Sequence, residues 1–233
     1  MKSFRLSGFA TLLIAGLAGQ ASAAPIVNGD FETPLSPNAN FLNYAVGTAT
    51  LTGWNVVGPV GEVVSIVNTN FVQNGVAFHA QSGNQWLDLT GFNNNNTEGV
   101  SQSVATVIGD VYQLSLWVGN TTGGSIFGTT STVNVQLNGS AFHSAVNSDV
   151  NTTGLSWEQY TYAFTATGLS TTLAFLNGDP SGDNSNGLDN IVLTDLGPAG
   201  TNRVPEPMTI GLFGAGLAGL AGMRRKRKTS KAE

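Results

Sequence analysis

Short segments in which apolar and polar residues alternate recur through the middle of the chain, and they constrain its fold most. In the stretch VYQLSLWVGN, every second residue from Tyr112 to Val118 is apolar. The stretches TVNVQLNG and WEQYTYAFTAT, at 132–139 and 157–167, repeat this alternation. A period of two residues is typical of half-buried β-strands, and no segment shows the period of an amphipathic helix over three turns. The sequence therefore predicts an all-β domain.

Asn-Gly pairs indicate where such strands turn. They occur at 74–75, 138–139 and 177–178, and this dipeptide favours the tight turns that connect neighbouring antiparallel strands. Many short strands separated by turns are typical of two packed sheets. We therefore expect a β-sandwich with a jelly-roll arrangement over residues 24–198.

The N-terminus has the pattern of an export signal. Lys2 and Arg5 precede the apolar stretch LSGFATLLIAGLAG, and the small residues ASA follow at 21–23. A cationic start, a short apolar centre and small residues before the cleavage point are typical of a secretory signal peptide. We expect residues 1–23 to be removed and to take no part in the fold.

The C-terminus has an apolar segment of a different kind. Residues 208–223 carry no charge and are rich in glycine, and RRKRK follows at 224–228. The apolar stretch is slightly shorter than the ~20 residues that cross a bilayer comfortably, and the cations resist translocation. We expect a linker at 199–207, a transmembrane helix at 208–223 and a basic cytoplasmic tail at 224–233.

The tail resembles a known sorting signal. VPEP, a short glycine-rich apolar span and an arginine-rich end follow one another in the order of the PEP-CTERM sorting domain of Gram-negative bacteria. The resemblance implies that Pro205, Glu206 and Pro207 are recognised by an exosortase, which processes the protein at the membrane. It also implies a protein that is transiently anchored in the inner membrane, accompanies exopolysaccharide production and reaches the outer surface or the extracellular matrix.

Basic residues are almost absent between the two ends. Of nine Lys and Arg residues only Arg203 lies between 24 and 203, whereas twelve of fourteen Asp and Glu residues lie there, which gives a formal charge of −11. Such a surface does not neutralise phosphates, so we exclude nucleic acid as a partner. Divalent cations and neutral ligands such as sugars are compatible with it. The chain contains no cysteine, which excludes disulfides and thiolate chemistry.

The domain itself resembles the galactose-binding-like jelly rolls that occur in many carbohydrate-binding modules. The resemblance rests on IVNGDFETP at its start, GLDNIVLTDL at its end, and LTGWNVV, GNQWLDLTG and GVSQSVATVIGDVYQLSLWVGN between them. It implies that the first and last strands lie together and that a structural calcium ion binds Glu32 and Asp189. Calcium prefers carboxylate and carbonyl oxygens, which agrees with this pair. The alternative is that both carboxylates accept hydrogen bonds from backbone amides.

A sugar ring packs against exposed aromatic faces, while amides and carboxylates bind its hydroxyl groups. The aromatic candidates are Trp54, Trp86, Trp117, Trp157, Phe92 and Phe127. Trp54 and Trp86 occupy positions that are structural in the resembling modules. Trp117 points away from the predicted apolar side of its strand, so it is either packed on a second face or exposed. We expect ligand contacts from Phe92, Trp117, Asn94 and Gln102.

The sequence gives no sign of catalysis. It contains no GxSxG, HExxH or phosphate-binding loop, and the two histidines, His79 and His143, lie in alternating segments. We therefore expect a non-catalytic module that binds exopolysaccharide or another glycan. A structural matrix protein without a selective ligand is the alternative, and a glycoside hydrolase is a third. An exposed aromatic strip favours the first, a featureless surface the second, and two carboxylates in one cleft the third.

Overall fold

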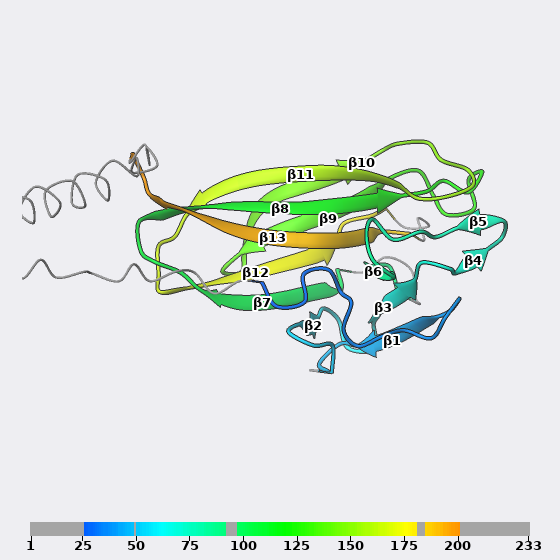
Figure 1. Cartoon of the computed structure of the whole chain (residues 1–233), viewed down its shortest axis with the longest axis horizontal. Coiled ribbons are helices and arrows are strands. Elements are labelled where there is room, and N and C mark those ends of the chain that lie inside the picture. Colours follow the sequence, from blue (N-terminus) through cyan, green and yellow to red (C-terminus); the bar gives the residue numbers. More distant parts are fainter. Residues whose placement is uncertain (1–25, 49, 92–96, 181–184, 201–233) are drawn as a thin grey trace, which may run out of the picture.

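A computed structural model describes residues 26–48, 50–91, 97–180 and 185–200, and the elements within them are all β-strands (Figure 1). Thirteen strands form two large sheets and one small hairpin. The prediction of an all-β domain is therefore confirmed.

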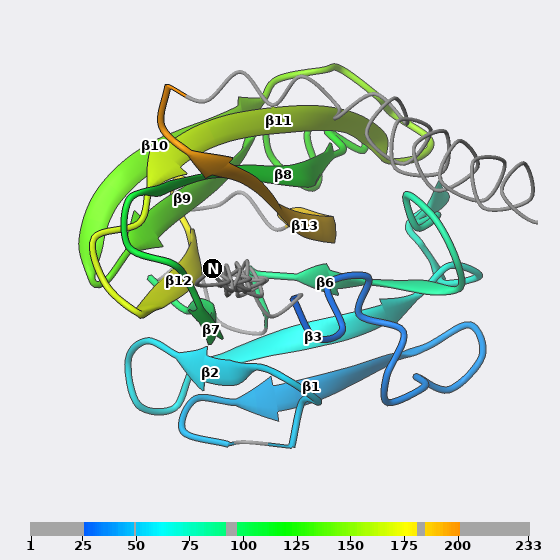
Figure 2. The same cartoon turned by 60° about the vertical axis from the view of Figure 1, so that its left-hand side comes forward.

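The larger sheet has six strands in the order β1-β3-β6-β13-β8-β11, and every pairing in it is antiparallel. Their bounds are Phe41–Ala45 (β1), Val63–Asn68 (β3), Gln85–Asp88 (β6), Gly187–Pro198 (β13), Asp110–Asn120 (β8) and Ser156–Thr165 (β11). The sheet curls, with β11 and β8 on one side of the molecule and β3 and β1 on the other (Figure 2).

The second sheet has five strands in the order β10-β9-β12-β7-β2. Their bounds are Ser140–Asn147 (β10), Ser131–Leu137 (β9), Ser170–Asn177 (β12), Gly99–Ala105 (β7) and Asn55–Val57 (β2). Strands β4 (Val72–Gln73) and β5 (Val76–Ala77) form a separate two-stranded hairpin at one end of the molecule (Figure 1). The arrangement is the expected jelly-roll β-sandwich.

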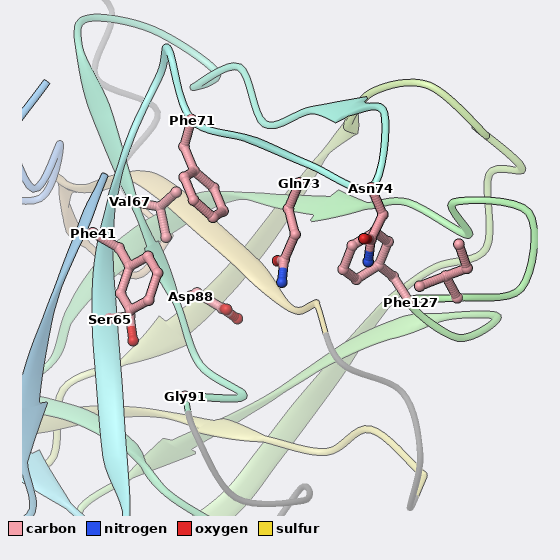
Figure 3. A pocket seen from close by; sticks show the side chains of 10 residues that line it. Phe41, Ser65, Val67, Phe71, Gln73, Asn74, Asp88, Gly91 and Phe127 are labelled. Atoms are coloured by element: carbon pink, nitrogen blue, oxygen red, sulfur yellow. The ribbon is translucent and has the colours of Figure 1, made fainter. Parts of the chain in front are cut away.

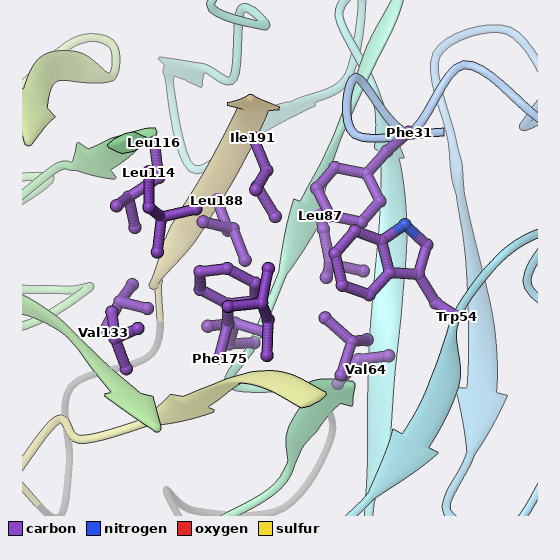
Figure 4. Packing of buried hydrophobic residues seen from close by; sticks show 14 of the residues in the cluster. Phe31, Trp54, Val64, Leu87, Leu114, Leu116, Val133, Phe175, Leu188 and Ile191 are labelled. Atoms are coloured by element: carbon purple, nitrogen blue, oxygen red, sulfur yellow. The ribbon is translucent and has the colours of Figure 1, made fainter. Parts of the chain in front are cut away.

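The main core lies between the two large sheets, as the alternation in the sequence predicts. From β8 the alternate residues Leu114, Leu116 and Val118 point into it, opposite Val133 and Phe175 of the five-stranded sheet (Figure 4). Burial of a large apolar side chain contributes about 1.5–3 kcal/mol, so this set of contacts holds the sheets together.

The two ends of the domain lie together. The N–H of Ile191 in β13 donates a hydrogen bond of 2.8 Å to the carbonyl oxygen of Gly29. A Cβ atom at position 29 would lie 2.2 Å from the carbonyl oxygen of Ile191, so only glycine permits this approach. The opening segment forms no strand up to Asn40, so an irregular segment takes the place beside β13 that the resemblance gives to the first strand. The first strand, β1, is separated from β13 by β3 and β6.

Two of the three Asn-Gly pairs form the expected turns. Asn74 and Gly75 connect β4 to β5, and Asn138 and Gly139 connect β9 to β10, with positive φ at all four residues. The third pair does not: Asn177 is the last residue of β12, and the chain then crosses to β13 in the other sheet. The side-chain amide of Asn177 is buried and forms hydrogen bonds with Glu98 and Asn186.

No helix within the described ranges is long and apolar enough to cross a membrane. The expected signal peptide at 1–23, transmembrane helix at 208–223 and basic tail at 224–233 lie outside these ranges, as do Pro205, Glu206 and Pro207.

Candidate functional site

Glu32 and Asp189, the two predicted calcium ligands, meet the same segment of chain. Glu32 Oε1 accepts hydrogen bonds from the backbone N–H groups of Asn84 (2.7 Å) and Gln85 (3.0 Å). Asp189 Oδ2 accepts from those of Gln81 (3.1 Å) and Ser82 (3.4 Å). The structure therefore brings the pair together at loop 81–85, where they connect the opening segment to the last strand.

Burial dominates the electrostatics of this pair. The pKa of the Asp189 carboxyl group is raised to about 7, mainly because the residue is fully buried and in smaller part because of the neighbouring charge of Glu32. The backbone N–H groups of Asn190, Ser82 and Gln81 act in the opposite direction. The described residues between 26 and 200 contain no Lys or Arg, so no basic side chain there offsets this negative charge.

The pair fits a calcium ion in part. Glu32 Oε1 and Asp189 Oδ2 accept two N–H groups each, whereas Glu32 Oε2 and Asp189 Oδ1 accept one hydrogen bond each and are more open to a cation. No group of three or more Asp, Glu, His or Cys in the described part of the chain is arranged to hold a metal ion. Calcium at this point would take its remaining ligands from backbone and amide oxygens. The calcium site therefore stays a prediction.

Of the four predicted ligand-binding residues, the structure describes Gln102 and Trp117, which lie on different sheets. The Gln102 side chain is buried and tied to the backbone, because its Oε1 accepts from Val27 N–H (2.8 Å) and its Nε2 donates to Val27 (3.0 Å) and Gly53 (2.8 Å). This placement gives it a structural role and no open polar atom for a ligand. Phe92 and Asn94 lie outside the described ranges.

Trp54 lies in the main core between the sheets, whereas Trp86, Trp117 and Trp157 lie on the outer face of the six-stranded sheet. Trp54 and Trp86 are both buried, as expected for structural residues. Trp117 lies on β8 between Asp189 and Gln159 in the strand register, and it is partly exposed on the outer face. Trp157 covers Gly119 and Gly187 on the same face, where side chains would collide with its ring.

A second apolar cluster lies on this outer face, near the hairpin β4–β5. It consists of Val67, Val76, Phe78, Trp86 and Phe127. The Trp86 indole N–H donates to the carbonyl of Phe78 (3.0 Å), and that of Trp157 donates to His79 (3.0 Å). These bonds hold the segment that carries the hairpin against the sheet.

A cavity of about 380 Å³ opens beside this cluster (Figure 3). Residues of β1, β3 and β6 form one side of it, and the hairpin and loop 121–130 contribute the rest. Its apolar lining residues are Phe41, Val67, Phe71, Ile126 and Phe127, and its polar ones are Ser65, Gln73, Asn74 and Asp88. A few polar groups among apolar walls are typical of a small-molecule site.

Aromatic rings form much of the cavity wall. The rings of Phe41 and Phe71 lie edge to face, with centroids 5.4 Å apart and planes at 81°. Phe127 makes a similar contact with Phe78 at 5.2 Å and 87°, and Phe78 also packs against Phe71 at 5.6 Å. Because each ring is held by another, the walls are preformed.

Asp88 supplies the only carboxyl group among the described residues that line the cavity. Its Oδ1 accepts hydrogen bonds from the N–H (3.0 Å) and hydroxyl (2.8 Å) of Thr90 and from the N–H of Asn186 (3.2 Å), whereas its Oδ2 accepts none from the described residues. Burial raises the pKa of Asp88 to about 6, and the bonds from Thr90 and Asn186 oppose the rise. The carboxyl group is therefore positioned firmly and ionised at neutral pH, with one oxygen open.

Asn186, which donates a backbone hydrogen bond to Asp88, also belongs to a buried polar network. The side-chain Nδ2 of Asn186 donates to Asn177 Oδ1 (2.7 Å), and Asn177 Nδ2 donates to Glu98 Oε1 (3.4 Å). Glu98 is 0 % exposed, and its Oε2 has no hydrogen-bond partner within the described part of the chain. The pKa of Glu98 is raised to about 7, mainly by burial and in smaller part by the charges of Glu62 and Asp88.

The fold and this cavity define a β-sandwich protein with an aromatic-walled site, and the sequence places it in a family. Residues 24–193 match the family described as Protein of unknown function (DUF642), and the chain belongs to that family. Residues 203–227 match the PEP-CTERM protein-sorting motif, which confirms that prediction. The motif implies an exported protein that is processed at the membrane by an exosortase. A comparison with curated proteins finds no match.

Solved structures share the fold at low sequence identity. A Stig cyclase from Fischerella sp. TAU, in complex with an indole compound, is 15% identical, has a TM-score of 0.54, and is matched over 76% of this chain and 100% of that chain. An apo-form cyclase from Fischerella sp. is also 15% identical, with a TM-score of 0.55 over 76% and 98%. A CBM22-1 xylan-binding domain from Paenibacillus barcinonensis is 16% identical, with a TM-score of 0.41 over 69% and 97%. The likeness to the two cyclases concerns the fold alone.

Proposed function

We propose that the protein is a non-catalytic glycan-binding protein of the cell exterior, and that the cavity beside the hairpin β4–β5 receives a sugar unit. The proposed ligand is an extracellular polysaccharide, because the sorting motif directs the chain out of the cell where such polymers are found. The proposed setting is the outer surface or the matrix of a biofilm.

The composition of the cavity wall carries this proposal. Three phenylalanines offer apolar contact to the carbon–hydrogen faces of a sugar ring. Gln73 and Asn74 offer amide donors and acceptors, and Asp88 offers a carboxylate that accepts from hydroxyl groups. The volume of about 380 Å³ lies within the usual ~300–1,000 Å³ of small-molecule sites. A binding role fits better than hydrolysis, because a glycosidase needs two carboxyl groups across the substrate and the described lining residues include one.

We also propose a structural calcium ion at Glu32 and Asp189. The supporting observations are the burial of Asp189, the proximity of the two carboxylates and the absence of Lys or Arg between 26 and 200. The ion would neutralise the pair and fasten the opening segment and β13 to loop 81–85. It would take no part in glycan binding, because neither residue lines the cavity.

A glycan array with the purified full-length protein in mild detergent tests the binding role. Phe71→Ala and Trp117→Ala form the informative pair, since Phe71 lines the cavity and Trp117 is partly exposed elsewhere on the same sheet. We expect Phe71→Ala to weaken binding about tenfold and Trp117→Ala to leave it unchanged. Gln73→Ala, at an exposed position of the hairpin, provides a second cavity variant with little effect on packing.

Loss of binding in Trp117→Ala with retention in Phe71→Ala and Gln73→Ala would place the ligand at the face predicted from sequence and refute the cavity. Absence of binding to every glycan would refute the binding role and favour a structural matrix protein.

A further inference from the structure

The distribution of charge limits which sugars the cavity can accept. Residues 26–200 contain twelve Asp and Glu residues and no Lys or Arg. An acidic sugar would meet a carboxylate in the cavity and no basic side chain in the described ranges that could bind it. Polymers of uronic acids are therefore poor ligands, and neutral or cationic sugars remain.

Asp88 makes a cationic sugar a better ligand for the cavity than a neutral one. Three donors hold its Oδ1, while its Oδ2 accepts no hydrogen bond from the described residues. The side chain projects towards the cavity between Ser65 and Gln73 (Figure 3). A carboxylate fixed in this way, with one free oxygen, is suited to a charge-assisted hydrogen bond from a cationic donor.

The surroundings of Asp88 favour a cation as well. The other described residues that line the cavity carry no titratable side chain, so nothing among them competes with Asp88 for a cation. The aromatic rings of Phe41, Phe71 and Phe127 present faces with negative potential, which attract cations within about 6 Å. The amide oxygens of Gln73 and Asn74 supply two further acceptors.

We propose that the cavity selects an amino sugar with a free ammonium group, which binds the open oxygen of Asp88 between the phenylalanine rings. This inference rests on the proposed glycan-binding function and names its ligand class. An N-acetylated sugar of the same shape carries no charge, so it forgoes both the charge-assisted bond and the cation–π contacts.

Calorimetric titration of the full-length protein in mild detergent tests the preference at pH 7. The probes are the β-1,4-linked trimer of glucosamine and its fully N-acetylated counterpart. We expect the free amine to bind at least about tenfold more tightly. Asp88→Asn should reduce this ratio to near one while the N-acetylated trimer still binds. Asp149→Asn, which removes an exposed acid that does not line the cavity, should leave the ratio intact.

Lowering the pH tests the same contact without a substitution. Because burial raises the pKa of Asp88 to about 6, the carboxyl group is ionised at pH 7 and protonated at pH 5, and the preference for the amine should disappear at pH 5. Equal affinity for both trimers at pH 7, or a preference that survives in Asp88→Asn, would overturn the inference and leave the glycan-binding role in place. Absence of binding by either trimer and by every glycan on the array would overturn both.

Discussion

Replacement of Glu98 by Gln should flatten the pH dependence of the protein's stability. Glu98 is 0 % exposed, its Oε2 has no hydrogen-bond partner in the described ranges, and no Lys or Arg occurs between 26 and 200 to pair with it. Burial raises its pKa from 4.5 to about 7. The folded protein therefore binds more protons at Glu98 than the unfolded chain does between about pH 4.5 and 7.

The sign and size of the effect follow from this difference. The free energy of unfolding falls as the pH rises through the window, because the native state must release a proton that it holds more tightly. The change from 4.5 to about 7 corresponds to about 3 kcal/mol, at about 1.36 kcal/mol for each pH unit. This stabilisation is fully present below pH 4.5 and is lost above pH 7. Asp88 and Asp189, with pKa values raised to about 6 and about 7, act in the same direction.

Urea unfolding at pH 5 and pH 8, followed by tryptophan fluorescence, measures the effect. The unmodified protein should lose stability over this range, and Glu98→Gln should lose about 2.5 kcal/mol less, because part of the shift lies below pH 5. The amide can raise or lower the absolute stability, so the difference between the two pH values is the relevant quantity. Glu158→Gln, at an exposed position of β11, should behave like the unmodified protein. A Glu98→Gln variant with the full pH dependence of the unmodified protein would refute the reasoning.

Three further predictions concern calcium, the core and the sorting signal. A chelator should lower the melting temperature of the purified protein if calcium binds Glu32 and Asp189. In Glu32→Gln the melting temperatures with and without chelator should be equal. A melting temperature of the unmodified protein that the chelator does not change would count against the ion. Phe175→Ala, at a fully buried site of β12, should cost about 3–5 kcal/mol in urea unfolding, whereas Thr172→Ala on the other side of that strand should cost little. Replacement of Pro205, Glu206 and Pro207 by alanine should leave the C-terminal tail unprocessed on an immunoblot, and normal processing would contradict the exosortase assignment.

The strands could be read from the sequence where local chemistry decides. The alternation that begins at Tyr112 predicts β8, and the turns at Asn74 and Asn138 form because asparagine and glycine tolerate positive φ. Asn177-Gly178 was misread because the same dipeptide precedes a crossover between the sheets, where the amide of Asn177 is needed by the buried network. A local signal cannot show which partner an amide will meet.

The cavity could not be read in the same way, because its lining spans residues 41 to 127 and is assembled by sheet pairing. Phe127 is among the aromatic candidates that the sequence suggests, but Phe41, Phe71 and Asp88 are not. The sequence contains one usable signal. Trp86 and Asp88 lie two residues apart on one strand, so an acidic side chain and a large aromatic ring point to the same face of the sheet. The burial of Gln102 could not be predicted locally either, because its side chain bonds to Val27, which is 75 positions away in the sequence.

The lack of basic side chains in the sandwich also determines how the protein meets proteases. Enzymes of the trypsin type cut after Lys or Arg, and between Arg5 and Arg203 the chain contains neither. Trypsin would therefore trim the two ends and leave the whole body as a single fragment, whether that body is folded or unfolded. The resistance of the sandwich to this class of enzyme comes from its amino-acid composition and does not depend on folding, so it would persist under conditions that unfold the domain.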